Sequence, residues 1–127
     1  MSTGRRPRLR TGGPGRGLDT TLNSTPVAGY IRSARLAPVE SATWQSEMEA
    51  YGRARGYRLQ IFFEFGVSAV RANKPVLAQV IAELRRGTYA GLLVPAMSHI
   101  AATDRQMQQI AAQLEECHAW IEECSKN

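Results

Sequence analysis

From residue 27 onward, short apolar runs alternate with longer segments that carry apolar residues at helical spacing. The apolar runs cover 27–32 (VAGYIR), 57–65 (YRLQIFFEF), 90–96 (AGLLVPA) and 119–123 (AWIEE). Short apolar runs are typical of strands in a parallel sheet, because such strands are buried on both faces. Four strands alternating with helices predict an α/β fold: a three-layer, mostly parallel four-stranded sheet with helices on both faces, joined by right-handed crossovers.

The three intervening segments have the patterns of amphipathic helices. In 40–56, Ser41 or Thr43 is placed to cap a helix that Gly56 ends, and its apolar face comprises Trp44, Met48 and Tyr51. Segment 74–87 opens on Lys-Pro, and its apolar face comprises Val76, Leu77, Val80, Ile81 and Leu84. Segment 103–116 opens on Thr103 as a cap, and its face comprises Met107, Ile110, Ala111 and Leu114.

Residues 1–26 have a different composition from the rest of the chain. They contain five Gly, three Pro and few large apolar residues, which predicts a disordered tail before a folded domain at 27–127. The tail has a net charge of +4, whereas the remaining residues, with 11 basic and 10 acidic side chains, sum to +1. One interpretation is a flexible arm that binds DNA phosphates through Arg5, Arg6, Arg8, Arg10 and Arg16. The other is a solubilising extension.

The chain has no sign of a membrane span or of an oxidising compartment. No run of about 18 apolar residues occurs, and no apolar core follows the N-terminal arginines as in a signal peptide. We therefore expect a cytoplasmic protein, with association with the bacterial nucleoid as an option. Cys117 and Cys124 would lie ~10 Å apart on one helix, too far for a disulfide, so we expect free thiols. A zinc site with His118 would need a fourth ligand, and we expect no metal or cofactor.

Polar residues follow three of the predicted strands. In parallel sheets, ligands gather beyond the carboxyl ends of the strands. This places 32–35 (RSAR), 64–68 (EFGVS) and 97–99 (MSH) along one rim. No glycine-rich phosphate-binding motif follows a strand.

These three loops contain a candidate set for phosphoryl transfer. A serine nucleophile needs a reactive hydroxyl, fixed cations around the phosphate and an acid for the leaving oxygen. Ser33 with Arg32 and Arg35 supplies the first two. Glu64 and His99 are candidate acids, with Arg105 one turn into the next helix. His99 has an alternative interpretation as a structural histidine on an apolar flank.

Three stretches resemble the catalytic domain of the small serine recombinases, the resolvase/invertase family, over about residues 27–121. They are GYIRSAR, ARGYRL and EFGVSAVRANKPVLAQVIAELRRGTYAGLLV. The family pattern is Y-x-R-x-S after the first strand, an acidic-x-G-[IV]-S-G loop, R-P opening a helix, and L-D-R-[LF]-x-R after the third strand. The resemblance implies that Tyr30 and Arg32 match the first motif. It implies that Glu64 and Ser68 match the second, while Lys74 stands for the Arg of R-P.

The sequence departs from this pattern where the family's chemistry takes place. Ala34 stands at the nucleophile position, with Ser33 one place early, and alternation along a strand directs these two side chains to opposite sides. In the third motif, Ser98, His99 and Ala102 replace the acid and the two Arg residues. We therefore predict a degenerate, non-cleaving family member associated with DNA binding or recombination. The alternatives are an active recombinase using Ser33, and a protein-interaction domain with no nucleic-acid role.

The resemblance also bears on partners. Active family members continue into a long dimerisation helix and a helix-turn-helix that reads DNA, and this sequence stops at Asn127. We therefore expect DNA contacts from the tail or from Arg35 at the rim, with weak sequence specificity. A recombinase-like or other protein is a second candidate partner, and a weak homodimer is a third. No membrane partner is expected.

Overall fold

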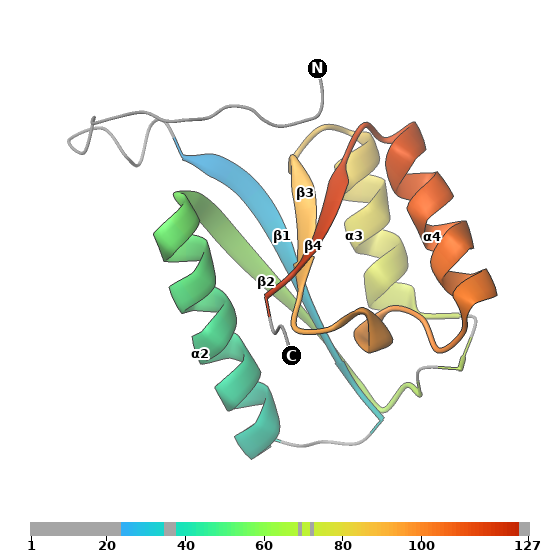
Figure 1. Ribbon diagram of the computed structural model, residues 1–127. Helices are drawn as coiled ribbons and strands as arrows, with labels where there is room; N and C mark the ends of the chain where they lie inside the picture. The colour runs from blue at the N-terminus through green and yellow to red at the C-terminus, as the bar shows by residue number, and fades with distance from the viewer. Residues whose placement is uncertain (1–23, 35–37, 69, 72, 125–127) are drawn as a thin grey trace.

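The computed structural model describes residues 24–34, 38–68, 70–71 and 73–124 of the 127-residue chain. Its elements are β1 (Thr25–Ser33), α2 (Pro38–Arg55), β2 (Tyr57–Phe65), α3 (Pro75–Arg85), β3 (Gly91–Val94), the 3-10 turn η2 (Met97–His99), α4 (Asp104–Glu116) and β4 (Trp120–Glu123). The strands form one sheet in the order β2-β1-β3-β4, and every neighbouring pair is parallel (Figure 1). The predicted α/β fold class is confirmed.

Helices cover both faces of the sheet, as the direction of the crossovers requires. The chain steps outward from β1 to β2 and then returns across β1 to β3 and β4. Because parallel crossovers are right-handed, reversing the direction moves the connecting helix to the opposite face. Figure 1 shows α2 on one side of the strands and α3 and α4 on the other.

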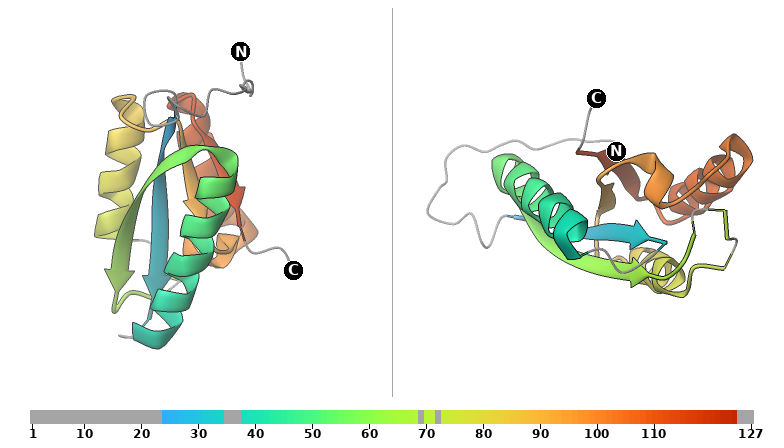
Figure 2. Two further views of the ribbon diagram at one scale, coloured as in Figure 1. Left: turned by 90° about the vertical axis from the view of Figure 1, so that its left-hand side faces the viewer. Right: turned by 90° about the horizontal axis from the view of Figure 1, so that it is seen from below.

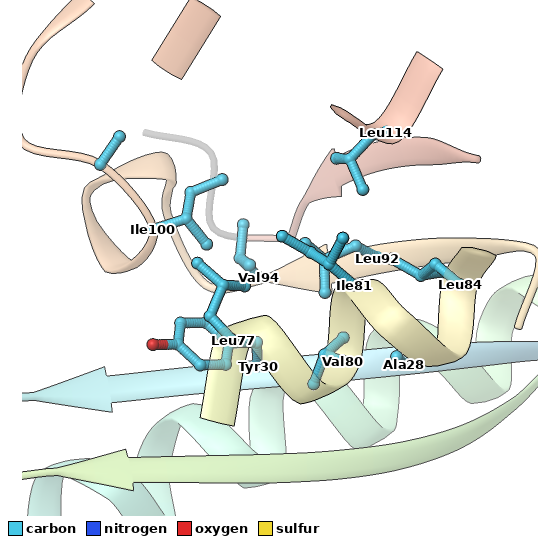
Figure 3. Packing of buried hydrophobic residues seen from close by; sticks show 11 residues of the cluster. Ala28, Tyr30, Leu77, Val80, Ile81, Leu84, Leu92, Val94, Ile100 and Leu114 are labelled. Carbon is cyan, nitrogen blue, oxygen red and sulfur yellow. The ribbon is translucent and has the colours of Figure 1, made fainter. Parts of the chain in front are cut away.

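Two apolar clusters fill the layers on either side of the sheet. The larger lies under α3 and α4 (Figure 3) and contains Ala28, Tyr30, Leu77, Val80, Ile81, Leu84, Leu92, Val94, Ile100, Ala101 and Leu114. The smaller lies under α2 and contains Val27, Ile31, Met48 and Leu93. Even-numbered residues of β1 therefore face α3, and odd-numbered residues face α2. The predicted helix faces are confirmed except for Ala111, which is exposed.

The helix ends agree with the predictions in two cases and differ in one. Gly56, with φ of 76°, follows the last residue of α2, and the Thr103 side chain accepts the Gln106 N–H at 3.1 Å as the cap of α4. The predicted cap of α2 at Ser41 or Thr43 is wrong. Both lie inside a helix that begins at Pro38, and the Thr43 hydroxyl donates to the Val39 carbonyl within that helix. Proline suits a first helical turn, which explains the earlier start.

The strand bounds differ slightly from those predicted. β1 begins at Thr25, two residues before the predicted strand, because the Thr25 N–H donates to the Gly56 carbonyl at 3.2 Å and Thr25 pairs with Tyr57. β2 has the predicted bounds. Among the helices of the described residues, none has both the length and the apolar character that crossing a bilayer requires.

Candidate functional site

The three predicted loops meet at the carboxyl ends of the strands, and the Arg32 side chain joins two of them to β1. Its Nη1 donates to the Val67 carbonyl at 2.8 Å, its Nε to the His99 carbonyl at 3.1 Å and its Nη2 to the Ser98 carbonyl at 3.5 Å. The guanidinium is thus occupied by backbone oxygens of the second and third loops. Three of its five N–H donors are used in this way, so Arg32 fixes the two loops relative to β1.

His99 acts as a hydrogen-bond acceptor at the end of β1. Its Nδ1 accepts the Arg32 peptide N–H at 2.9 Å, and its buried ring meets Trp44 edge to face with centroids 4.5 Å apart. Burial, and secondarily the charge of Arg32, lowers the pKa of His99 to about 4. An imidazole that accepts at Nδ1 is neutral and carries its proton on Nε2. This geometry agrees with the alternative interpretation of His99 as a structural histidine.

Glu64 joins β1, β2 and α3. Its carboxylate is buried and accepts the Tyr30 hydroxyl at 2.5 Å, the Val76 N–H at 2.9 Å and the Leu77 N–H at 3.2 Å. A carboxylate at a helix N-terminus satisfies peptide donors and interacts favourably with the helix dipole. Burial and the Glu64 contact raise the pKa of the Tyr30 hydroxyl far above its usual value. Glu64 therefore caps α3, with three donors already on its oxygens.

Ser33 ends β1 on the side away from Arg32. It pairs with Phe65 in the parallel register, and its carbonyl accepts the Gly66 N–H at 2.8 Å. Because the strand runs through Ser33, alternation places its side chain with Ile31 on the α2 face, whereas Arg32 follows Tyr30 on the α3 face. Ser33 is only 8% exposed, while Ala34 beyond the strand is exposed.

The remaining predicted residues are spread along the rim. Ser68 is partly exposed, and its carbonyl accepts the Arg71 N–H at 3.2 Å in a turn of the second loop. Arg105 is exposed in the first turn of α4 and, within the described residues, makes no hydrogen bond with Arg32 or His99. The proposed DNA contacts Arg5, Arg6, Arg8, Arg10, Arg16 and Arg35 lie outside the described residues.

Two rim residues were not predicted from the sequence as part of the site. Lys74 is buried at the N-terminus of α3, where its amine donates to the Arg71 carbonyl at 2.5 Å. Burial, followed by the charge of Arg32, lowers the pKa of Lys74. Glu123 of β4 accepts the Met97 N–H at 2.8 Å and so holds the start of η2. The acidic pair that closes the fourth apolar run was the only sequence signal for the role of Glu123.

A second polar cluster lies under α2, away from the rim. The hydroxyls of Tyr51 and Tyr57 both donate to the Glu122 carboxylate, the latter at 2.6 Å, and Arg55 Nε lies 3.3 Å from the same carboxylate. Burial and the bond to Glu122 raise the pKa of Tyr51 to about 12. Because these residues come from α2, β2 and β4, the cluster ties the helix to both edges of the sheet.

The cysteines lie on opposite faces of the sheet. Cys117 packs against the larger apolar cluster and Cys124 against the smaller one, and both thiols are free. Within the described part of the chain, no three His, Cys, Asp or Glu side chains are grouped so that they could hold a metal ion.

Comparison with known proteins gives a consistent result. The family model described as "Resolvase, N terminal domain" matches residues 27–122. The N-terminal catalytic domain of TP901-1 integrase superposes with a TM-score of 0.69 at 15% identity, covering 76% of this chain and 76% of that one.

Two further solved structures are similar. A resolvase family site-specific recombinase from Streptococcus pneumoniae has a TM-score of 0.65 at 13% identity, covering 80% of this chain and 72% of that one. The C-terminal catalytic domain of ISC1926 TnpA, an IS607-like serine recombinase, has a TM-score of 0.71 at 12% identity, covering 80% and 68%. At these identities the likeness establishes the fold. No curated protein sequence matches the chain.

Proposed function

The chain belongs to the resolvase family of serine recombinases, and on this basis we propose that it is a non-cleaving member that associates with DNA. The observation that carries the proposal is the separation of Ser33 from Arg32. These neighbours lie on opposite faces of β1, and the Arg32 guanidinium is occupied by three backbone carbonyls.

Covalent strand cleavage needs a hydroxyl and several cations around one phosphate. Ala34 stands at the family's nucleophile position and has no hydroxyl. Ser33, the nearest hydroxyl in sequence, sits on the α2 face of the strand, away from the guanidinium that would neutralise the transition state. A phosphate beside Arg32 would therefore meet a methyl group where the attacking oxygen is needed.

Two other rim groups are also tied to the fold itself. His99 is held neutral by burial, and the Lys74 amine donates to the Arg71 carbonyl. Losing one oxyanion-type donor costs about 10²–10³ in rate, so several such losses beside a missing nucleophile leave no measurable strand exchange. This supports loss of the reaction while the fold is kept.

Association with DNA is proposed to come from the N-terminal arginines. The described residues contain nine basic and ten acidic side chains, so this part of the chain offers DNA no net attraction. Residues 1–26, with five arginines and one aspartate, carry +4 of the net charge of +5 of the full chain. Contacts of this kind go to phosphates and depend strongly on salt.

The cleavage part is tested with supercoiled DNA and the full chain. We expect no covalent protein–DNA adduct on denaturing gels, and the same result for Ser33→Ala. An adduct formed by the wild-type protein and lost in Ser33→Ala would instead establish an active recombinase, for which Arg32, His99 and Arg105 would be the assisting residues.

The DNA part is tested by gel shift at increasing salt. We expect log affinity to fall linearly with log salt concentration. The slope should be no steeper than about −4.5, the value for five phosphate contacts. Replacing Arg5, Arg6, Arg8, Arg10 and Arg16 by Gln should abolish the shift. Replacing the exposed Arg53, Arg85 and Arg86 by Gln is the control and should leave the gel shift unchanged. No shift even at the lowest salt would eliminate DNA and favour a protein-interaction domain.

A further inference from the structure

β2 forms an edge of the sheet, and its outer side carries a row of peptide groups that lack strand partners. Nine residues of β2 pair with β1, and no other described strand pairs with β2 (Figure 2). The Gly66 N–H and the Gly56 carbonyl, at either end of β2, both bond inward to β1 and its flanks. Because successive peptide groups alternate in direction, those of Leu59, Ile61 and Phe63 point outward.

This edge has few of the features that normally protect an edge strand, and its one exposed charge is Arg58 on the α3-facing side. Residues 57–65 contain no Pro and no Lys, and every residue on the α2-facing side of β2 is apolar: Tyr57, Leu59, Ile61, Phe63 and Phe65. Phe63 and Phe65 are each 36% exposed and stack on one another with centroids 5.8 Å apart. An exposed apolar edge strand is a template for pairing with another strand.

We propose that β2 pairs antiparallel with β2 of a second copy, about a two-fold axis through Gln60, to form a symmetric dimer with one continuous sheet. In this register Tyr57 lies opposite Phe63 of the second copy, and Leu59 lies opposite Ile61. The outward peptide groups of these residues exchange hydrogen bonds, and the Phe63 ring is covered by a second aromatic ring. The dimer does not depend on DNA and goes beyond the function proposed above.

Charge complementarity on the α3 face selects this register. Beside Phe62 the surface has a hollow of about 310 Å³, which is also lined by Gln79, Ala82, Glu83 and Arg86. A two-fold axis at Gln60 places Arg58 of the second copy opposite Phe62, directly over this hollow. Arg58 is exposed and donates to Ser24 Oγ at 3.1 Å, a contact that it would exchange for the ring and for the Glu83 carboxylate, which it would share with Arg86.

Sedimentation of the full chain over a range of concentrations tests the dimer. We expect a monomer–dimer equilibrium in the wild-type protein and a monomer in Phe63→Lys, because a charge on an edge strand opposes pairing. Val70→Lys is the matched control: Val70 is 67% exposed but lies between β2 and α3, outside the edge strand, so the dimer should persist in this variant. A wild-type protein that stays monomeric up to its solubility limit overturns the proposal, as does a dimer that survives Phe63→Lys.

Two further variants test the register. The two Gln60 side chains would face each other across the axis, with Cβ atoms about 4.5–5.5 Å apart, so Gln60→Cys should form a disulfide-linked dimer on mild oxidation. Gln109→Cys on exposed α4 should not. Arg58→Glu should weaken the dimer, and adding Glu83→Arg should restore it. A dimer that neither crosslinks at Gln60 nor responds to this charge exchange uses another surface and overturns the proposal.

Discussion

The peptide N–H of Arg32 donates to Nδ1 of His99 at 2.9 Å, so a side chain of the third loop continues the hydrogen bonding of β1 beyond the end of β3. One bond therefore fixes both the end of the first strand and the position of η2. The His99 ring also contacts Trp44 of α2, the helix on the face of the sheet opposite α3 and α4. This contact connects the rim to α2.

His99→Ala should destabilise the protein by about 1–3 kcal/mol from the hydrogen bond alone, because it leaves the partly buried Arg32 N–H without an acceptor. The emptied ring site should add to this loss. His99→Asn is the informative comparison, since its amide oxygen can take the place of Nδ1. Urea unfolding should rank wild type, Asn and Ala in that order, and equal losses for Asn and Ala would contradict a role through the acceptor.

The free energy of unfolding should decrease as the pH is lowered, because His99 titrates. The group is neutral in the folded protein down to a pKa of about 4, whereas it protonates near 6.5 when unfolded. The unfolded state therefore binds more protons between these values, and stability decreases as pH falls from about 6.5 to 4. The loss from this group is at most about 3 kcal/mol. Carboxylates titrate in the same pH range, so the measurement compares the free energy of unfolding of wild type with that of His99→Asn. The difference between the two should narrow as pH falls.

Apolar periodicity was sufficient to predict four parallel strands and the apolar faces of the helices apart from Ala111, although it did not predict the strand order. It could also place the three loops on one rim, because strand direction fixes that result. It could not predict what Arg32 and Glu64 do there. An arginine in a motif suggests a residue that binds phosphate. In the structure, the Arg32 guanidinium instead donates hydrogen bonds to the carbonyls of Val67, Ser98 and His99. Contacts of this type join residues more than 30 positions apart and leave no local pattern.

The Glu122 cluster illustrates the same limit. Tyr51, Arg55 and Tyr57 lie close in sequence, but Glu122 is more than 60 residues away, and each has an ordinary local interpretation as a helix or strand residue. Likewise, Ser41 and Thr43 have the residue types of a helix cap, but α2 begins earlier, at Pro38. The sequence therefore predicts which segments are helices and strands, but not the tertiary contacts of the Glu122 cluster or the first residue of α2.

Removing the Arg32 side chain should loosen the loops without unfolding the sheet. Arg32→Ala deletes the donors to the second and third loops, whereas the peptide N–H to His99 remains. Amide exchange should therefore accelerate in residues 66–71 and 97–101 and stay unchanged in β1 and β3. The exposed Arg53→Ala is the control and should alter neither loop. Uniform acceleration over the whole sheet would show that Arg32 contributes to global stability instead.

Glu64→Gln should weaken the start of α3. The amide keeps one acceptor for the N–H groups of Val76 and Leu77 but points an NH₂ group at donors, and the negative charge at the helix N-terminus is lost. We expect a loss of about 1–3 kcal/mol in the free energy of unfolding. Tyr30→Phe should cost less, because two donors to the carboxylate remain. The exposed Glu115→Gln should be neutral, and a similar loss there would argue against a specific cap.

Two glycine-to-alanine changes should have opposite signs. A Cβ on Gly91 would lie 2.2 Å from the Trp120 ring, a distance that forces the neighbouring strand to move. A Cβ on Gly52 in α2 meets Leu59 and Tyr57 at 3.6–3.7 Å, which is ordinary contact. Gly52→Ala should thus raise stability by about 0.5–1 kcal/mol through helix propensity. Gly91→Ala should lower it by about 1–3 kcal/mol, as overpacking does. Both are measured by thermal and urea unfolding, and a neutral Gly91→Ala would mean that Trp120 does not pack on β3 as described.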